Sequence, residues 1–259
     1  MLNITTTELN TWLATLLWPL TRILGLLASA PVLGNNAIPV QIKLGLAILL
    51  TILVAPSLPP LPKIDPGSGI GLVILLQQVV IGLAMGFAMR IVFTAVEMAG
   101  EIIGLQMGLG FATFFDPQHS GQVQLIGRFF GLITTLAFLT IDGHLQIVAL
   151  LVRSFSILPI GLEGVTALSF ATLTNWGIEI FTLGLRLALP VLTALLITNL
   201  ALGILTRAAP QLNIFAVGFP LTLGIGLVMM SLTLPYFAPV LRQIFLDGFS
   251  MAHTLIEPP

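Results

Sequence analysis

Long apolar runs, separated by short polar or turn-forming segments, are the dominant pattern of this chain. Runs without a charged residue cover 9–21, 23–42, 44–62, 66–89, 102–115, 129–141, 164–178, 187–206 and 208–241. A helix that crosses a hydrocarbon core needs about 20 apolar residues. The pattern predicts six long helices, at 9–33, 37–58, 68–108, 122–141, 170–208 and 213–248, and a shorter one near 143–157.

Turn-forming residues separate these predicted helices. The separating segments are LGNNAIP (33–39), PSLPPLPKIDPGSG (56–69), GLQMGLGFATFFDPQHSGQ (104–122), TIDGH (140–144), LPIGLEG (158–164) and RAAPQLN (207–213). The proline-rich stretch 56–66 is predicted to be extended, because proline fixes its own φ and restricts the preceding residue. Asp142 is predicted to cap the N-terminus of the short helix.

Two of the predicted helices, 68–108 and 170–208, are too long for a simple span. About 40 residues at 1.5 Å per residue extend about 60 Å, twice the thickness of a hydrocarbon core. Either these segments break into helical hairpins or the protein extends beyond the bilayer plane. Prolines inside the apolar runs predict kinks at Pro19, Pro190, Pro220, Pro235 and Pro239.

The high content of hydrophobic residues and the low content of charged residues support the prediction of a membrane protein. Of the 259 residues, 57% are hydrophobic and 7% are charged, whereas soluble domains carry about 25% charged residues. The sequence therefore predicts an all-α membrane protein, surrounded by a membrane or by a large apolar complex. The net charge of −1 gives no support for nucleic-acid binding, and the absence of cysteine excludes disulfides and thiolate metal sites. The N-terminus lacks the basic residues of a signal peptide.

Charged residues inside the predicted helices share helix faces. Arg90, Glu97 and Glu101 are spaced by seven and four residues, which places them within about 40° of one face. Glu179 and Arg186, seven apart, share a face in the same way. Both sets could line an ion or proton pathway. Pairing with each other or with partner subunits is the favoured interpretation, because charges inside membranes are commonly paired.

Small residues recur at the spacing that lets helices approach closely. Gly100, Gly104 and Gly108 repeat every fourth residue, as do Gly82 and Gly86. We interpret these glycines as packing positions against helices of this chain or of another subunit. Asn199, alone in an apolar run, is interpreted as a hydrogen-bonding residue between helices.

Catalytic patterns do not occur in the sequence. The three histidines, His119, His144 and His253, are scattered. Asp116 and His119 could suggest a metal site, but an Asp-Pro turn is the better explanation of DPQH. No nucleophile stands beside a base, and no glycine-rich loop has the context of a nucleotide site. We expect no enzymatic activity, no cofactor and no metal.

Two long motifs carry a resemblance to a known family. They are AGEIIGLQMGLGFATFFDP (99–117) and ALPVLTALLITNLALGILTRAAPQLNIFAVGFPLTLGIGL (188–227), which combine apolar residues with specific Gly, Glu, Gln, Asp, Asn, Arg and Pro positions. Shorter supporting stretches are WPLTRILGLLASAPVL (18–33), IPVQIKLGLAILLTILVAPSLP (38–59), QQVVIGLAMGFAM (77–89), GHLQIVALLV (143–152) and LPIG (158–161). The chain resembles the FliR/SctT family of type III secretion export-gate subunits. Glu97 and the segment QHSGQ (118–122) have no counterpart in the family's pattern.

The resemblance implies a fold, a function and partners. Residues 1–165 would resemble a FliP-like fold and residues 166–259 a FliQ-like fold, as helical hairpins in one chain. Members of the family assemble with FliP-like and FliQ-like subunits into a gate, next to FlhB-like and FlhA-like export components. Unfolded flagellar subunits pass through this gate. The expected location is the bacterial inner membrane, as a multi-pass protein of the flagellar basal body.

The resemblance also implies a role for the aromatic loop after residue 106. Family members hold a plug inside the pore, and the matching residues here are Met107, Gly110, Phe111, Phe114, Phe115, Asp116 and Pro117. Bulky apolar side chains can close a pore by dewetting. Gly108, Gly110 and Gly121 supply permissive backbone. Judged from the residues alone, the loop would instead be an aromatic segment packed statically on a neighbour.

Two other functions remain as alternatives. A multispanning small-molecule transporter would show repeated halves with interrupted helices in corresponding positions. The only internal similarity is a weak one between residues 44–56 and 223–235. A passive structural anchor would leave membrane permeability unchanged when the loop is altered.

Overall fold

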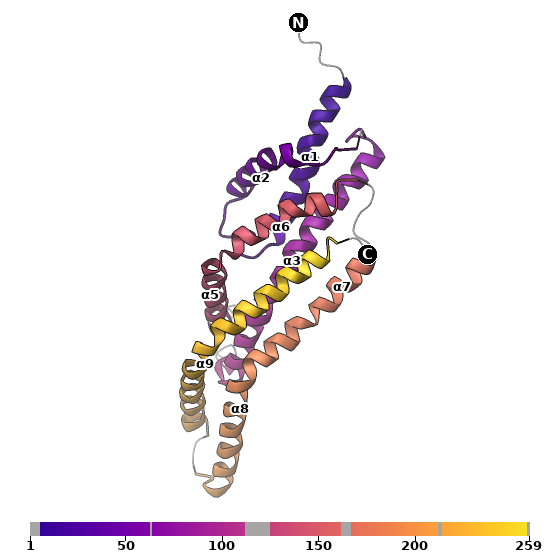
Figure 1. Cartoon of the computed structure of the whole chain (residues 1–259). Coiled ribbons are helices and arrows are strands. Elements are labelled where there is room, and N and C mark those ends of the chain that lie inside the picture. Colours follow the sequence, from indigo (N-terminus) through magenta and orange to yellow (C-terminus); the bar gives the residue numbers. More distant parts are fainter. Residues whose placement is uncertain (1–5, 63, 112–124, 162–166, 212–213, 258–259) are drawn as a thin grey trace. The chain divides into compact units, whose positions relative to one another are not determined.

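The structure is a computed structural model that describes residues 6–62, 64–111, 125–161, 167–211 and 214–257. Across these ranges the regular structure is helical and no strand occurs (Figure 1). The elements are α1 Thr6–Ser29, α2 Val40–Val54, η1 Ala55–Ser57, α3 Gly69–Gln106, η2 Leu109–Phe111, α5 Leu125–Thr140, α6 Gly143–Ile157, α7 Ala167–Gly177, α8 Glu179–Ala208 and α9 Ile214–Thr254. The prediction of an all-α protein is confirmed.

The helices have the length and apolar character of membrane spans. Five helical stretches meet these criteria among the described residues, or up to six if α5 and α6 together form one broken span. The stretches are Trp12–Ser29, Val40–Ser57, Gly69–Gln106, Ala171–Ala208 and Ala216–Thr254. This agrees with the apolar pattern, which predicted six long helices.

The two longest predicted helices behave differently in the structure. Helix α3 is one continuous helix of 38 residues, which corresponds to about 57 Å, so it does not break into a hairpin (Figure 1). The predicted helix 170–208 is interrupted, because α7 ends at Gly177 and α8 begins at Glu179. Ile178 between them keeps helical dihedral angles, φ −63° and ψ −29°. The interruption is therefore local.

Prolines lie inside three of the helices. Pro19 lies inside α1 and Pro190 inside α8. Helix α9 is 41 residues long, continues past Pro220, Pro235 and Pro239, and ends at Thr254, six residues beyond the predicted end at 248. Where proline sits inside a helix it removes one backbone hydrogen bond. The three helices nevertheless continue on both sides of their prolines.

Two local predictions concern the segments between helices. Leu58, directly after η1, is extended, with φ −69° and ψ 141°, but Pro56 and Ser57 belong to the 3-10 helix η1, so the prediction of an extended stretch from residue 56 is wrong at its start. Asp142 occupies the N-cap position of α6, but its side chain makes no capping hydrogen bond, so the predicted mechanism is wrong. Asp142 instead adopts a left-handed conformation, φ 55° and ψ 31°. Its carbonyl oxygen accepts hydrogen bonds from the amides of Leu145 and Gln146, at 2.9 and 3.1 Å.

The chain divides into two compact units that are not contiguous in sequence. Unit 1 consists of residues 1–91, 139–177 and 245–259, and unit 2 of residues 92–138 and 178–244. Helices α3 and α9 each contribute to both units.

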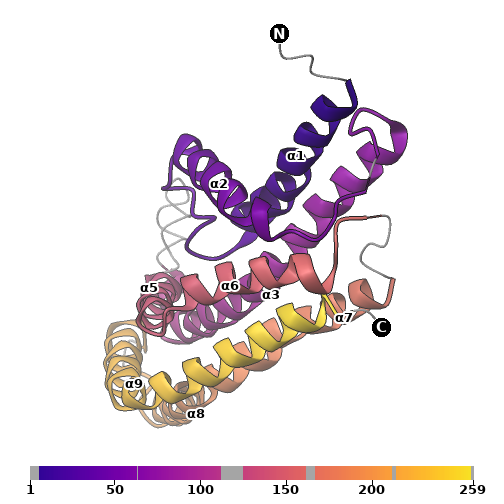
Figure 2. The same ribbon diagram turned by 45° about the horizontal axis from the view of Figure 1, so that its top comes forward.

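In unit 1, α1 packs against the first half of α3. Trp18, Ile23 and Leu26 of α1 are fully or almost fully buried, as are Ile74 and Ile81 of α3. Helix α2 lies beside α1 in both views (Figures 1 and 2). Most of the α2 surface remains exposed in the isolated chain, since only 17% of the span Val40–Ser57 is buried.

In unit 2, aromatic rings join the second half of α3 to α5, and α5 to α9. The Phe93 and Phe138 rings meet edge to face with centroids 5.3 Å apart. The Phe130 and Phe237 rings do so at 4.9 Å. Such pairs add about 0.5–1.5 kcal/mol beyond the area that they bury. Within unit 2, α5 therefore contacts both the second half of α3 and α9.

Candidate functional site

The candidate site begins where α3 ends. Met107 follows the helix directly and is 1% exposed. Gly108 has φ 88°, a backbone conformation that glycine adopts without steric penalty. Its amide donates to the carbonyl oxygen of Leu105 at 3.0 Å. The positive φ at Gly108 turns the chain out of α3 and into η2.

Helix α9 holds this turn from one side. The Thr222 hydroxyl lies 3.1 Å from the Met107 carbonyl oxygen, and equally far from the Gly218 carbonyl oxygen of its own helix. The last carbonyls of a helix lack partners inside it, so Thr222 can satisfy one of them. At Gly226, an added Cβ would lie 2.6 Å from the Met107 Cγ. Gly226 therefore provides the space that the Met107 side chain fills.

Helix α5 holds the other end of the same segment. A Cβ at Gly100 of α3 would meet the Ile126 carbonyl oxygen at 2.7 Å and the Gly127 Cα at 2.8 Å. The two helix backbones touch here because neither side has a side chain in the way. The described residues that flank 112–124 therefore belong to packed structure, with Met107 held against α9 and the first turn of α5 held against α3.

The predicted plug residues fall into two groups. Met107 is buried at the fixed base, which makes it an anchor of the loop in this structure. Gly110 lies in η2 and is half-buried. Phe111 belongs to η2 by its backbone, and its side chain is not described. The remaining residues lie outside the described ranges: Phe114, Phe115, Asp116, Pro117, His119 and Gly121.

The predicted charge cluster on α3 lies largely at the surface of the isolated chain. Arg90 and Glu97 are exposed and Glu101 is half-buried. Glycines of α5 make room for both carboxylate side chains. A Cβ at Gly131 would lie 2.9 Å from the Glu97 Oε1, and one at Gly127 would lie 2.8 Å from the Glu101 Cγ. The pairing of these charges stays a prediction.

The other predicted polar positions are on α8. Glu179 lies in the first turn of α8 and is half-buried, whereas Arg186 and Asn199 are exposed. Gly184, between the two charged residues, packs closely, because a Cβ there would meet the Ala95 carbonyl oxygen at 2.9 Å. The ion pair and the interhelical hydrogen bond of Asn199 stay predictions.

The glycines near the start of α3 mark its crossing with α1. A Cβ at Gly82 would contact the carbonyl oxygen of Arg22, and one at Gly86 would contact the Ser29 hydroxyl. On the α1 side, a Cβ at Gly25 would meet the Val79 carbonyl oxygen at 2.6 Å. Backbones at this distance leave no room for side chains at the crossing.

Gly104 differs from Gly100 although both belong to the same spacing. A Cβ at Gly104 would meet the Ile126 Cγ1 at 3.5 Å, which is an ordinary van der Waals distance. The close approach of α3 and α5 is therefore centred on Gly100.

Sequence reasoning missed a buried cation. Arg22 of α1 is fully buried. Its Nε donates to the Gln78 Oε1 at 2.8 Å, its Nη1 to the Ser154 carbonyl oxygen at 2.9 Å, and its Nη2 to the Leu158 carbonyl oxygen at 2.9 Å. The guanidinium also lies 4.4 Å from the centre of the Phe155 ring. Arg22 thus ties α1 to α3 and to α6 through neutral partners.

The signal for Arg22 was present in the sequence. It is the only charged residue between Glu8 and Lys43. A single charged side chain in so long an apolar stretch costs free energy inside a membrane, so it needs hydrogen-bond partners within the protein. Those partners lie far away in sequence, which is why local pattern reading did not find them.

Comparison with known proteins gives one consistent result. The family described as bacterial export proteins, family 1, matches residues 13–248. The flagellar biosynthetic protein FliR of Escherichia coli K12 is 45% identical over 99% of this chain and 98% of its own length. FliR of Aquifex aeolicus is 35% identical over 95% of each chain. FliR of Bacillus subtilis is 26% identical over 86% of this chain and 87% of its own.

Proposed function

The chain belongs to the bacterial export proteins, family 1, and is a component of the flagellar export apparatus; from this premise we propose that it helps to form and seal the gate through which unfolded flagellar subunits are exported. The segment after α3 acts as the seal. This role needs a shaped, closable pore and no catalytic group. We therefore assign the chain no enzymatic activity.

The geometry at the base of this segment carries the proposal. Met107 is held by Thr222 and Gly226 of α9, and α5 restarts next to α3 at the contact of Gly100 with Gly127. Between these anchors the sequence has Phe111, Phe114 and Phe115. A seal has to remain attached while its tip moves aside for a passing chain. Firmly held ends joined by an aromatic, glycine-containing stretch meet that requirement.

Sealing by this segment rests on the physics of apolar constrictions. Water leaves a narrow channel that is lined by bulky apolar groups, and ions cannot cross the dry section. A polypeptide that passes through the pore can contact the aromatic side chains directly and displace them from the constriction. The same loop would thereby block ions when no chain is exported and move aside when an exported chain enters the pore.

From the same family membership we also propose the partner subunits of the chain, its two structural parts and its location in the cell. FliP-like and FliQ-like subunits complete the gate, with FlhB-like and FlhA-like components next to it. Residues 1–165 form the FliP-like part and residues 166–259 the FliQ-like part of one export-gate domain. The location is the inner membrane at the flagellar basal body.

The test compares ion conductance of the purified gate complex in planar bilayers. Replacing Phe111, Phe114 and Phe115 together by serine removes the apolar constriction and should raise resting conductance several-fold. The complex should still assemble, because α3, α5 and α9 keep their packing. Phe129→Ser, an exposed phenylalanine of α5 outside the loop, is the matched control and should leave conductance unchanged.

A single Phe→Ala change in the loop should have a much smaller effect, since the remaining rings can still fill the constriction. If the triple-serine complex assembles with unchanged conductance, the loop is packed statically and the sealing role is wrong. The family assignment would survive that result.

A further inference from the structure

We propose that the groove between α6 and the end of α9 binds a carboxylate-bearing segment of a neighbouring subunit of the export complex. The groove lies within unit 1 and has a volume of about 580 Å³. The inference rests on the proposed gate function, because it assigns this groove a place in the assembly.

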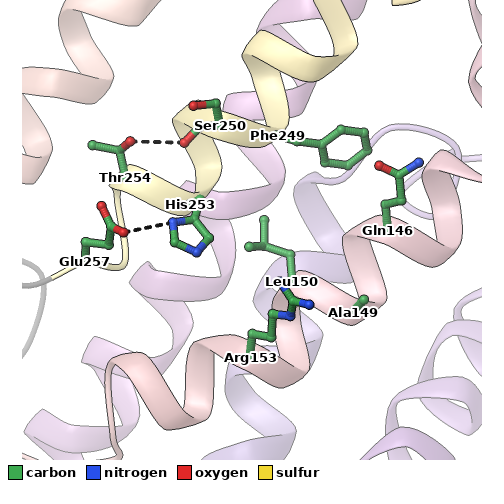
Figure 3. Close-up of a pocket in the computed structure, with 9 residues that line it drawn as sticks. All are labelled: Gln146, Ala149, Leu150, Arg153, Phe249, Ser250, His253, Thr254 and Glu257. Atoms are coloured by element: carbon green, nitrogen blue, oxygen red, sulfur yellow. Dashed lines mark hydrogen bonds and ion pairs between the residues drawn. The ribbon is translucent and has the colours of Figure 1, made fainter.

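Two helix faces line the groove. Helix α6 contributes Gln146, Ala149, Leu150 and Arg153, which share a face by their spacing of three, four and seven residues. The end of α9 contributes Phe249, Ser250, His253 and Thr254, and Glu257 lies three residues after the end of this helix. Figure 3 shows the Arg153 and His253 side chains pointing into the space between these elements.

Arg153 supplies a cation that is available for binding. Its side chain is exposed, and among the described residues no hydrogen bond or ion pair engages it. His253 and Glu257 instead hold each other, with Nδ1 and Oε1 3.2 Å apart. The carboxylate of Glu257 is thereby directed toward the histidine. The guanidinium of Arg153 offers a bidentate site whose natural partner is a carboxylate.

The groove also offers acceptors, which favours a protein segment over a lipid headgroup. The Gln146 amide nitrogen donates to the Ile141 carbonyl oxygen at 2.8 Å, so its oxygen remains an acceptor. The second carboxylate oxygen of Glu257 is another. A polypeptide brings N–H donors for these acceptors together with a carboxylate for Arg153. The phosphodiester of a lipid brings acceptors, and any donor has to come from a separate hydroxyl or ammonium group of the headgroup.

Apolar residues in the groove complete the match. Leu150 is buried on its floor and Phe249 is half-buried on its wall. They suit an aliphatic or aromatic side chain next to the acidic residue. The occupant is therefore an Asp or Glu flanked by an apolar residue on a neighbouring subunit.

The first experiment measures how much of the neighbouring subunits copurifies with the full-length chain in detergent. Arg153→Gln should lower recovery about tenfold or more, as expected when one member of an interfacial charge pair is truncated. Arg153→Lys should retain part of it. Arg242→Gln, an exposed arginine outside the groove, is the control and should match the unchanged chain.

The second experiment identifies the occupant. A photoreactive amino acid in place of Ala149, inside the groove, should cross-link to a neighbouring subunit next to an Asp or Glu. The same group in place of Val152, which is exposed on α6 but does not line the groove, should not produce that product. Mass spectrometry of the cross-linked peptide gives the contact.

The results separate this inference from the gate function itself. If the unchanged chain fails to copurify with any neighbour, the proposed function is wrong. If Arg153→Gln assembles as well as Arg242→Gln and position 149 gives no cross-link to protein, the groove inference is wrong while the gate function stands. Loss of copurified phosphatidylglycerol in Arg153→Gln, with intact assembly, would reassign the groove to lipid.

Discussion

At the scale of single residues, Arg22 shows how this chain accommodates a charge in an apolar interior. The guanidinium is satisfied by a side-chain amide, by backbone oxygens of the α6 end and by the face of Phe155. Hydrogen bonds to a charged group contribute about 1.5–3 kcal/mol each. The contacts join three helices, so the residue fixes their mutual positions.

Replacing Arg22 by methionine should therefore destabilise the folded chain by about 2–4 kcal/mol, since buried acceptors are left without a donor. Arg22→Lys should recover only part of this loss, because an ammonium cannot reach three acceptors in a planar fork. The measurement is thermal unfolding in detergent, followed by tryptophan fluorescence. Arg242→Met is the exposed control. Equal unfolding temperatures for the two methionine variants would mean that the Arg22 contacts add nothing.

At the scale of elements, the apolar pattern predicted where most helices lie. Helices α3 and α9 lie where long helices were predicted, at 68–108 and 213–248, but the sequence left open whether α3 would be continuous or break into a hairpin. The interruption at Ile178 was not predictable, because Gly177 and Ile178 lie in an apolar stretch and Ile178 keeps helical angles. The left-handed Asp142 was missed for a similar reason, since a side-chain cap and a backbone turn have the same sequence signal.

The contact of α3 with α5 gives a matched pair of substitutions. Gly100→Ala should destabilise the chain by about 1–3 kcal/mol, because the new methyl group meets the backbone of Ile126 and Gly127. Gly104→Ala should be neutral or stabilise the helix by up to about 1 kcal/mol, since its methyl group has ordinary space. Denaturation of both variants in the same detergent distinguishes them. Equal losses would mean that the helices do not approach most closely at Gly100.

At the scale of the whole molecule, family and membrane character were predictable, whereas the charge pairing was not. Arg90, Glu97 and Glu101 share a helix face, as their spacing requires, yet this face is largely exposed in the isolated chain. Sequence spacing shows which residues lie together on one helix. It does not show whether their partners belong to the same chain. The plug residues Phe114 and Phe115, outside the described ranges, are likewise assigned by resemblance alone.

Glu101→Gln tests the pairing in the assembled complex. If Glu101 neutralises a cation of a partner, its loss leaves that cation buried without a counterion and should lower complex recovery about tenfold or more. The measurement is copurification with the neighbouring subunits, together with export at several pH values. Full assembly combined with a pH-dependent loss of export would favour an ion or proton pathway.

The contacts of Arg22 also constrain the order in which the newly made protein can settle. Ser154, which accepts from Arg22, is separated from it by 132 positions, and at about 5–20 residues per second its synthesis follows roughly 7–26 s later. Of the hydrogen-bond partners that Arg22 has in the folded chain, only Gln78 is synthesised within that interval. The contacts of Arg22 with α6 are therefore completed only after α6 has been synthesised, whereas the close approach of α1 to α3 at Gly25 and Gly82 needs no residue of α6.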